Sequence, residues 1–285
     1  MKGFVSVTMF ITCLLLEIGI TPSFAGPIPP VWNPDPNFPD FYQKDPNVNN
    51  GGCACAPVAA TDSLFWLADK YNFPNLKTQG GATWQAVTNT LEGAAYMNTT
   101  NDNATYSGRF AAGKAKYISD AGYANQIVQL ALLGGNGMPP TIDWIKQEVA
   151  TGEDVEILIG AITDVAGGAA SWDGGHYVAV TGYDQNNLKI ADPWTNNNNN
   201  NENLPVTGSG NTTLNFDANG GAKPNYTQMY PRVNLQDGLF GGSQYDIIFA
   251  AVAESPAPEP GTLLLLGSAL AILVGLRNRK LRRSS

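Results

Sequence analysis

The residues of this chain that could do chemistry are a thiol, an imidazole and a carboxylate. The thiol is Cys55, which opens the run Cys-Ala-Pro, and the chain's one histidine is His176, which follows two glycines. Asp192 comes sixteen residues later, before a proline and a tryptophan. An imidazole can keep a nearby sulfur as the thiolate, and a carboxylate can orient the ring. These residue types in this order are the parts of a cysteine nucleophile site.

The spacing of the histidine and the aspartate predicts that they meet. Halfway between them lies Asp184, inside the turn-rich run 182–187. If a hairpin turns there, His176 and Asp192 lie opposite each other on one face of two antiparallel strands, about 5 Å apart. The carboxylate can then hold the imidazole ring. A lone histidine in an apolar strand also has a purely structural interpretation.

A helix is predicted directly after the thiol, over residues 57–71. Proline suits the first turn of a helix, and apolar residues such as Ala60 and Leu64 recur at helical spacing. Cys55 then lies at the N-terminus of this helix, where free N–H groups and the helix dipole stabilise negative charge. Cys53 is interpreted as an inert neighbour, and a role as nucleophile or redox partner is its alternative.

The rest of the body predicts an α+β domain with an N-terminal helical half and a C-terminal antiparallel sheet. Apolar residues at helical spacing predict further helices at 83–97, 108–121 and 141–150. Apolar runs and period-two patterns predict strands at 155–162, 176–183, 188–192, 212–216 and 245–252. The asparagines at 196–201 are interpreted as a polar surface loop.

The N-terminal end predicts export. Residues 1–25 combine Lys2, an apolar stretch and small residues up to Ala25, which is typical of a signal peptide that signal peptidase cuts after Ala25. Residues 26–50 follow with seven prolines and several asparagines. This composition predicts an extended arm with little regular structure.

The C-terminal end, residues 256–285, has three parts. Pro258-Glu259-Pro260 is followed by an apolar run that predicts a transmembrane helix over 262–276, and then by a basic cluster that holds that end in the cytoplasm. This tail resembles the PEP-CTERM sorting signal of Gram-negative bacteria. A plain C-terminal anchor is the alternative interpretation.

The resemblance of the tail implies a route for the protein. An exosortase-type sorting enzyme would cut near the Pro-Glu-Pro motif. Before that cut, the C-terminal helix would anchor the protein in the inner membrane. After the cut, the protein would reach the cell surface or the extracellular matrix.

Between the two ends, residues 51–255 are predicted to form one domain with a sizeable core. The whole chain has 16 basic and 24 acidic residues, and without its two ends the net charge is near −12. Nucleic acids and anionic lipids bind proteins through lysine and arginine. We therefore expect neither of them as a partner of the domain.

The cysteine count speaks against structural metal and disulfide bonds. Cys13 lies in the predicted signal peptide, which leaves Cys53 and Cys55. With one residue between them, these two can hardly reach normal disulfide geometry. A zinc site wants four cysteine or histidine ligands, and only two thiols and one imidazole are present. No metal and no cofactor are predicted.

Three short motifs, spread over about residues 48–195, resemble those of the papain-like cysteine peptidases. They are Cys55-Ala56-Pro57 before an apolar helix, Gly175-His176-Tyr177-Val178, and Asp192-Pro193-Trp194. Within that fold they are similar to the double-glycine leader peptidases, which process bacteriocin precursors. The resemblance implies that Cys55 is the nucleophile, His176 the base, and Asp192 the residue that orients the base. It also implies a peptide or protein substrate.

The chain departs from that family at two positions. Ala56 stands where the family has glycine. The family also places a glutamine about six residues before the cysteine to complete the oxyanion hole, and here that position is Asn49, followed by Asn50. An asparagine amide offers the same donor on a shorter arm. Asn49 and Asn50 are therefore the oxyanion-hole candidates, and Gln43 is a further one.

The sequence thus predicts an exported, surface-sorted cysteine peptidase that hydrolyses peptide bonds with a Cys-His-Asp triad. Two alternatives stay open. A transglutaminase-like acyl transferase would use the same triad with an amine in place of water. A catalytically inactive binding or extracellular matrix protein would keep the fold without the chemistry.

Overall fold

A computed structural model describes residues 28–135, 137–164, 170–195, 201–215, 225–235 and 245–257 of the chain. The predicted signal peptide with Ala25, the Pro258-Glu259-Pro260 motif and the predicted transmembrane helix at 262–276 lie outside these ranges. Within them, no helix is both long enough and apolar enough to cross a membrane.

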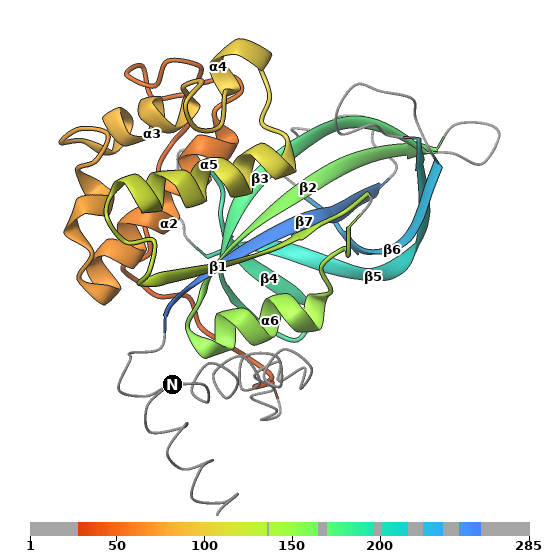
Figure 1. The fold of residues 1–285 in the computed structure, drawn as a ribbon. Coiled ribbons are helices and arrows are strands. Elements are labelled where there is room, and N and C mark those ends of the chain that lie inside the picture. The colour runs from red at the N-terminus through yellow and green to blue at the C-terminus, as the bar shows by residue number, and fades with distance from the viewer. Residues whose placement is uncertain are drawn as a thin grey trace, which may run out of the picture.

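Helices dominate the first half of the described chain (Figure 1). They are α2 (Cys55–Tyr71), the short 3-10 helix η1 (Pro74–Lys77), α3 (Trp84–Glu92), α4 (Thr99–Asp102), α5 (Ser107–Asp120) and α6 (Ile142–Thr151). Local capping sets several of their ends. The Thr83 and Thr141 side chains accept hydrogen bonds from the first turns of α3 and α6, and Gly152 ends α6 in the left-handed conformation.

The strands form one sheet in the order β1-β7-β2-β3-β4-β5-β6. Their bounds are β1 (Ile127–Leu133), β2 (Asp154–Asp164), β3 (Ala170–Tyr183), β4 (Asn187–Ala191), β5 (Glu202–Asn215), β6 (Asn225–Val233) and β7 (Tyr245–Pro256). Neighbours along this order are antiparallel, and β6 also pairs with the start of β7, which curls the sheet toward a barrel. The predicted α+β class with a helical N-terminal half and an antiparallel sheet is confirmed.

The sheet separates two apolar cores. Successive residues of β2 point into opposite cores. Leu158 belongs to the core that includes residues of α2 and α5, whereas Ile157 and Ile159 belong to the core that includes residues of α6. Figure 1 shows α6 on the opposite side of the sheet from α2 and α5. This arrangement fixes the N-terminus of α2 against the sheet.

The last residues of β7 lie beside β1. Pro256 is level with Ile127 in the strand pairing, and the N–H of Ala257 donates to the carbonyl of Gln126 at 2.7 Å. The sheet pairing therefore continues to the end of the described chain.

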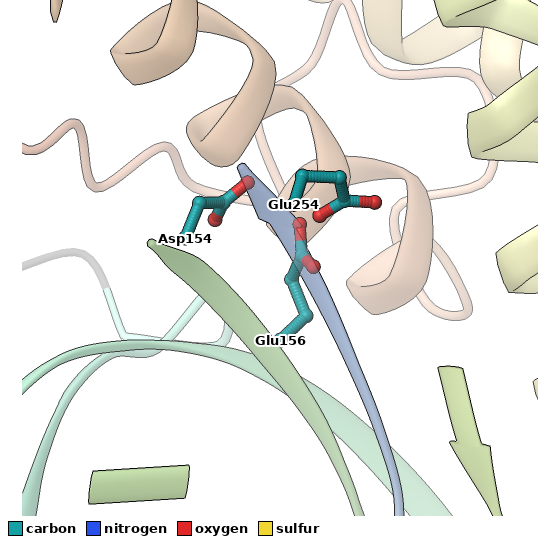
Figure 2. Close-up of side chains that lie close together, drawn as sticks. All are labelled: Asp154, Glu156 and Glu254. Carbon is teal, nitrogen blue, oxygen red and sulfur yellow. The ribbon is translucent and has the colours of Figure 1, made fainter. Parts of the chain in front are cut away.

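A buried ionic cluster joins α5 to the sheet. The Lys114 ammonium contacts Asp154 and Glu156 of β2 and Glu254 of β7, and all four side chains are fully buried. Figure 2 shows the three carboxylates gathered where the two strands run side by side, and their oxygens lie within 4.8 Å of one another. The lysine ammonium thus takes the position between carboxylates that a cation would take.

Electrostatics in this cluster favour an extra proton. Burial and the neighbouring Asp154 raise the pKa of Glu156 well above its ordinary value. Burial also raises the pKa of Glu254 to about 7, although Lys114 opposes the shift. A proton on these carboxyls reduces the net negative charge that the single lysine must balance.

Candidate active site

Cys55 is the first residue of α2, two residues before the predicted start of the helix. Ala54 caps the helix without a side-chain hydrogen bond, and the first turn contains no acidic residue. The free N–H groups and the positive end of the helix dipole therefore act on the Cys55 sulfur without competition from a capping side chain. The thiol is half-buried at this position.

His176 of β3 and Asp192, which directly follows β4, are in contact. The Nε2 atom of His176 lies 2.6 Å from Oδ1 of Asp192, and both side chains are buried. The same oxygen accepts a hydrogen bond from the backbone N–H of Trp194 at 2.9 Å, which fixes the carboxylate. The structure thus brings together the two residues that the hairpin argument paired.

The register of that hairpin differs from the predicted one. Ala179 is level with Ala191, and the pairing then slips between Val180 and Gly182, so that Thr181 is an extra residue on β3. Continued past β4, this register places Asp192 level with Val178, two residues from His176. Residues two apart on a strand share a face, so the contact survives as a diagonal pair.

Cys55 also acts on His176, because its sulfur is one of the groups that raise the pKa of the imidazole. Because Nε2 of His176 contacts Asp192, Nδ1 is the ring nitrogen that remains available to the Cys55 sulfur. Burial alone would lower the pKa of His176, but Asp192 and Cys55 outweigh burial and raise it to about 10. The ring is therefore held as the imidazolium at neutral pH, which is the state that stabilises a thiolate beside it.

Cys55 and His176 line a cavity of about 560 Å³. Residues at and before the N-terminus of α5 also line it, together with residues of β2, β3 and β7. Cys53 and Gln43 also line this cavity. The candidate nucleophile and base therefore face a space large enough for part of a substrate.

Of the three oxyanion-hole candidates, Gln43 lines the cavity, and Asn49 and Asn50 do not. The Gln43 side chain is buried, and its Nε2 donates to the carbonyl of Gly51 at 2.8 Å. An amide nitrogen has two N–H groups, so one remains. Asn49 is exposed, and its backbone N–H donates to Asn89.

The predicted arm packs along the domain. Trp32 forms an isolated bridge with Tyr183, and the backbone N–H of Phe41 donates to Asp62 of α2 at 2.9 Å. Of the arm residues that the structure describes, 28–50, Gln43 is the one that lines the cavity. The arm therefore places Gln43 at the cavity.

Cys53 differs from Cys55 in its electrostatic setting. Burial raises the pKa of Cys53, and the neighbouring Cys55 and Glu92 raise it further. Both thiols are free, so the two are not joined to each other. These shifts keep Cys53 protonated at neutral pH, which makes it the weaker candidate for the nucleophile.

Comparison with protein families identifies a PEP-CTERM protein-sorting motif at residues 256–280. The predicted sorting tail is thus confirmed as a motif, which implies export, surface sorting and exosortase-type processing. No curated protein matches the chain. Among solved structures, the chain is similar to one described as a C39-like peptidase from Bacillus anthracis. The sequence identity is 17%, the TM-score is 0.35, and the match covers 60% of this chain and 86% of the other.

Proposed function

We propose that the protein is a surface-sorted cysteine peptidase of papain-like fold that hydrolyses peptide bonds. The observation that carries this proposal is the position of His176. Its buried ring contacts Asp192 and lines the same cavity as Cys55, whose sulfur helps raise the pKa of the ring. A satisfied structural histidine needs neither a thiol at a helix N-terminus nor an adjoining cavity.

The residues support a two-step reaction. The Cys55 thiolate attacks the carbonyl carbon of the scissile peptide bond, and the His176 imidazolium gives its proton to the leaving amine. A thioester with Cys55 results. His176, now neutral, takes a proton from water, the hydroxide attacks the thioester, and the acid product leaves with the thiolate restored. Asp192 keeps the ring oriented throughout.

Two donors are available for the negative oxygen that forms in each step. The free backbone N–H groups of α2 lie at the end of the helix that begins with Cys55. The Gln43 amide lines the cavity that Cys55 also lines. Donors of this kind stabilise the tetrahedral intermediate because they are already oriented before the reaction.

Labelling with a thiol-reactive peptide epoxide tests the proposal. We expect one label per chain, on Cys55, formed rapidly at about pH 6, where a free thiol is mostly protonated. Cys53→Ser should label like the wild type, whereas Cys55→Ser should not label and His176→Ala should label slowly. Labelling of Cys55 that is independent of His176 would overturn the proposal.

Turnover separates hydrolysis from its rivals. A peptidase that labels at Cys55 should also release an amine from a peptide substrate in water. Incorporation of a labelled primary amine into a glutamine peptide, without hydrolysis, would indicate an acyl transferase instead. Absence of both activities and of the label would indicate a binding or matrix protein.

A further inference from the structure

One wall of the cavity beside His176 is formed by Trp172 of β3, and two glycines make room for its ring. A Cβ atom on Gly160 of β2 would overlap the Trp172 ring. A Cβ on Gly175 would come within 3.0 Å of both the Trp172 ring and Leu158. The indole therefore lies directly over the backbone of the two strands, where no side chain other than hydrogen fits beneath it.

The ring is also held from a third strand. Phe249 of β7 contacts Trp172 edge to face, with ring centroids 5.2 Å apart and an interplanar angle of 72°. Phe249 is itself buried and stacks on Tyr230 of β6 at 5.8 Å. Aromatic contacts of this geometry fix ring orientation. Trp172 is thus a fixed part of the wall.

The described residues that line the cavity are uncharged apart from the reacting pair. Leu158, Trp172 and Phe249 make one side apolar, and Asn103, Thr105 and Ser107 face it from the start of α5 and the segment before it. None of the described residues that line the cavity is a lysine, arginine, aspartate or glutamate. A charged side chain entering here would lose its hydration without gaining a partner.

We propose that Leu158, Trp172 and Phe249 form a specificity subsite for a bulky apolar side chain of the substrate, next to the scissile bond. This inference rests on the proposed peptidase function. It also separates this protein from the double-glycine leader peptidases that its motifs resemble. A pair of glycines has no side chain to fill this space, so substrates with leucine, methionine or phenylalanine should react faster.

Peptide epoxides that differ at the residue next to the electrophile test the subsite. We expect the second-order labelling rate of Cys55 to be at least about tenfold higher with leucine or phenylalanine than with glycine, since burying such a side chain favours binding by that factor or more. Aspartate should be slower still. Iodoacetamide, which has no side chain to place in the subsite, gives the reference rate for each variant.

Trp172→Ala should bring the leucine and glycine epoxides to within about threefold of each other, while the iodoacetamide rate stays the same. Gly160→Ala should do likewise, because the added methyl displaces a tryptophan that is still present. The matched controls are Trp32→Ala, on the arm, and Gly108→Ala, where an added Cβ meets nothing within 4 Å. Both should keep the wild-type preference.

The labelling experiment distinguishes a wrong peptidase function from a wrong apolar subsite. If no epoxide labels Cys55 in a His176-dependent way, the peptidase function is wrong. If labelling depends on His176 but the glycine, leucine and aspartate epoxides react equally fast, the peptidase function stands and the apolar subsite is wrong. Loss of the leucine preference in Trp32→Ala as well would also overturn the subsite.

Discussion

The backbone N–H of Gln43 donates to the carbonyl of Pro193 at 2.8 Å. This hydrogen bond ties the N-terminal arm to the residue that directly follows Asp192. The donor expected for the oxyanion and the carboxylate that orients His176 are therefore held by the same short segment.

Replacing Gln43 should impair catalysis and leave the thiolate intact. We expect Gln43→Ala to lower kcat about 100-fold or more, the usual cost of one oxyanion donor. The rate of iodoacetamide labelling of Cys55 should stay unchanged. Asn49→Ala and Asn50→Ala are the matched variants, because these residues occupy the expected sequence position without lining the cavity. If either of them lowers kcat more than Gln43→Ala does, the assignment to Gln43 is wrong.

The single histidine makes the protonation state of the site directly measurable. The imidazole signals in an NMR titration should show no midpoint near the ordinary value of 6.5 and should titrate at about pH 10. In Asp192→Asn the midpoint should move to lower pH. Burial lowers the pKa of His176, and this variant lacks the negative charge of Asp192 that raises it. Asp143→Asn removes a similar charge from the exposed first turn of α6 and should change nothing. A wild-type midpoint near 6.5 would contradict the ion pair.

The same shift predicts how stability depends on pH. Because folding raises the pKa of His176, the folded state binds this proton more tightly than the unfolded state. The contribution of this proton to the free energy of unfolding is complete below pH 6.5, the pKa of the unfolded state. It is lost as the pH rises through about 10, the pKa of the folded state. Urea unfolding of wild type and His176→Gln should show a stability gap that narrows between these limits, by at most roughly 5 kcal/mol at about 1.4 kcal/mol per pKa unit. A gap that is constant over this range would show that the proton is not held.

The buried cluster should be vulnerable to loss of its lysine. Lys114→Met leaves three buried carboxylates without a cation, and we expect a loss of about 3 to 5 kcal/mol in the free energy of unfolding. The loss should be smaller in mildly acidic solution, where the carboxyls take up protons. Lys116→Met removes an exposed lysine two residues away, whose partner is Asp120, and should have little effect. Equal urea midpoints for the two variants would refute a stabilising role of the cluster.

Local sequence signals predicted most of the helices and part of the site. Thr141 and Gly152 mark the ends of α6 by capping chemistry that is readable in the sequence. The proline after Cys55 indicated a helix whose N-terminus holds the thiol. The spacing of His176 and Asp192 indicated a hairpin. The observed register differs from the predicted one by two residues at Asp192. Because residues two apart on a strand point to the same face, the two side chains still meet, as a diagonal pair.

Features that depend on distant contacts were not predictable. The strand β1 was missed because Val128 and Leu130 are apolar yet about half exposed at the sheet edge, which hides the period of two. The strand β6 is polar and contains Pro231, and its place depends on pairing with β5. Similarly, Gln43 could not be preferred over Asn49 from sequence. Its position is fixed by Pro193, far along the chain.

The pairing of β7 with β1 ends at the hydrogen bond between Ala257 and Gln126. A cut anywhere after Ala257 removes none of the strand pairings of the described chain. Such a cut therefore leaves β7 in the same sheet as the strand that carries His176, and it removes none of the described residues that line the cavity. Exosortase-type processing of the sorting motif at any point after Ala257 would thus spare the hydrogen bonds that hold the described domain together.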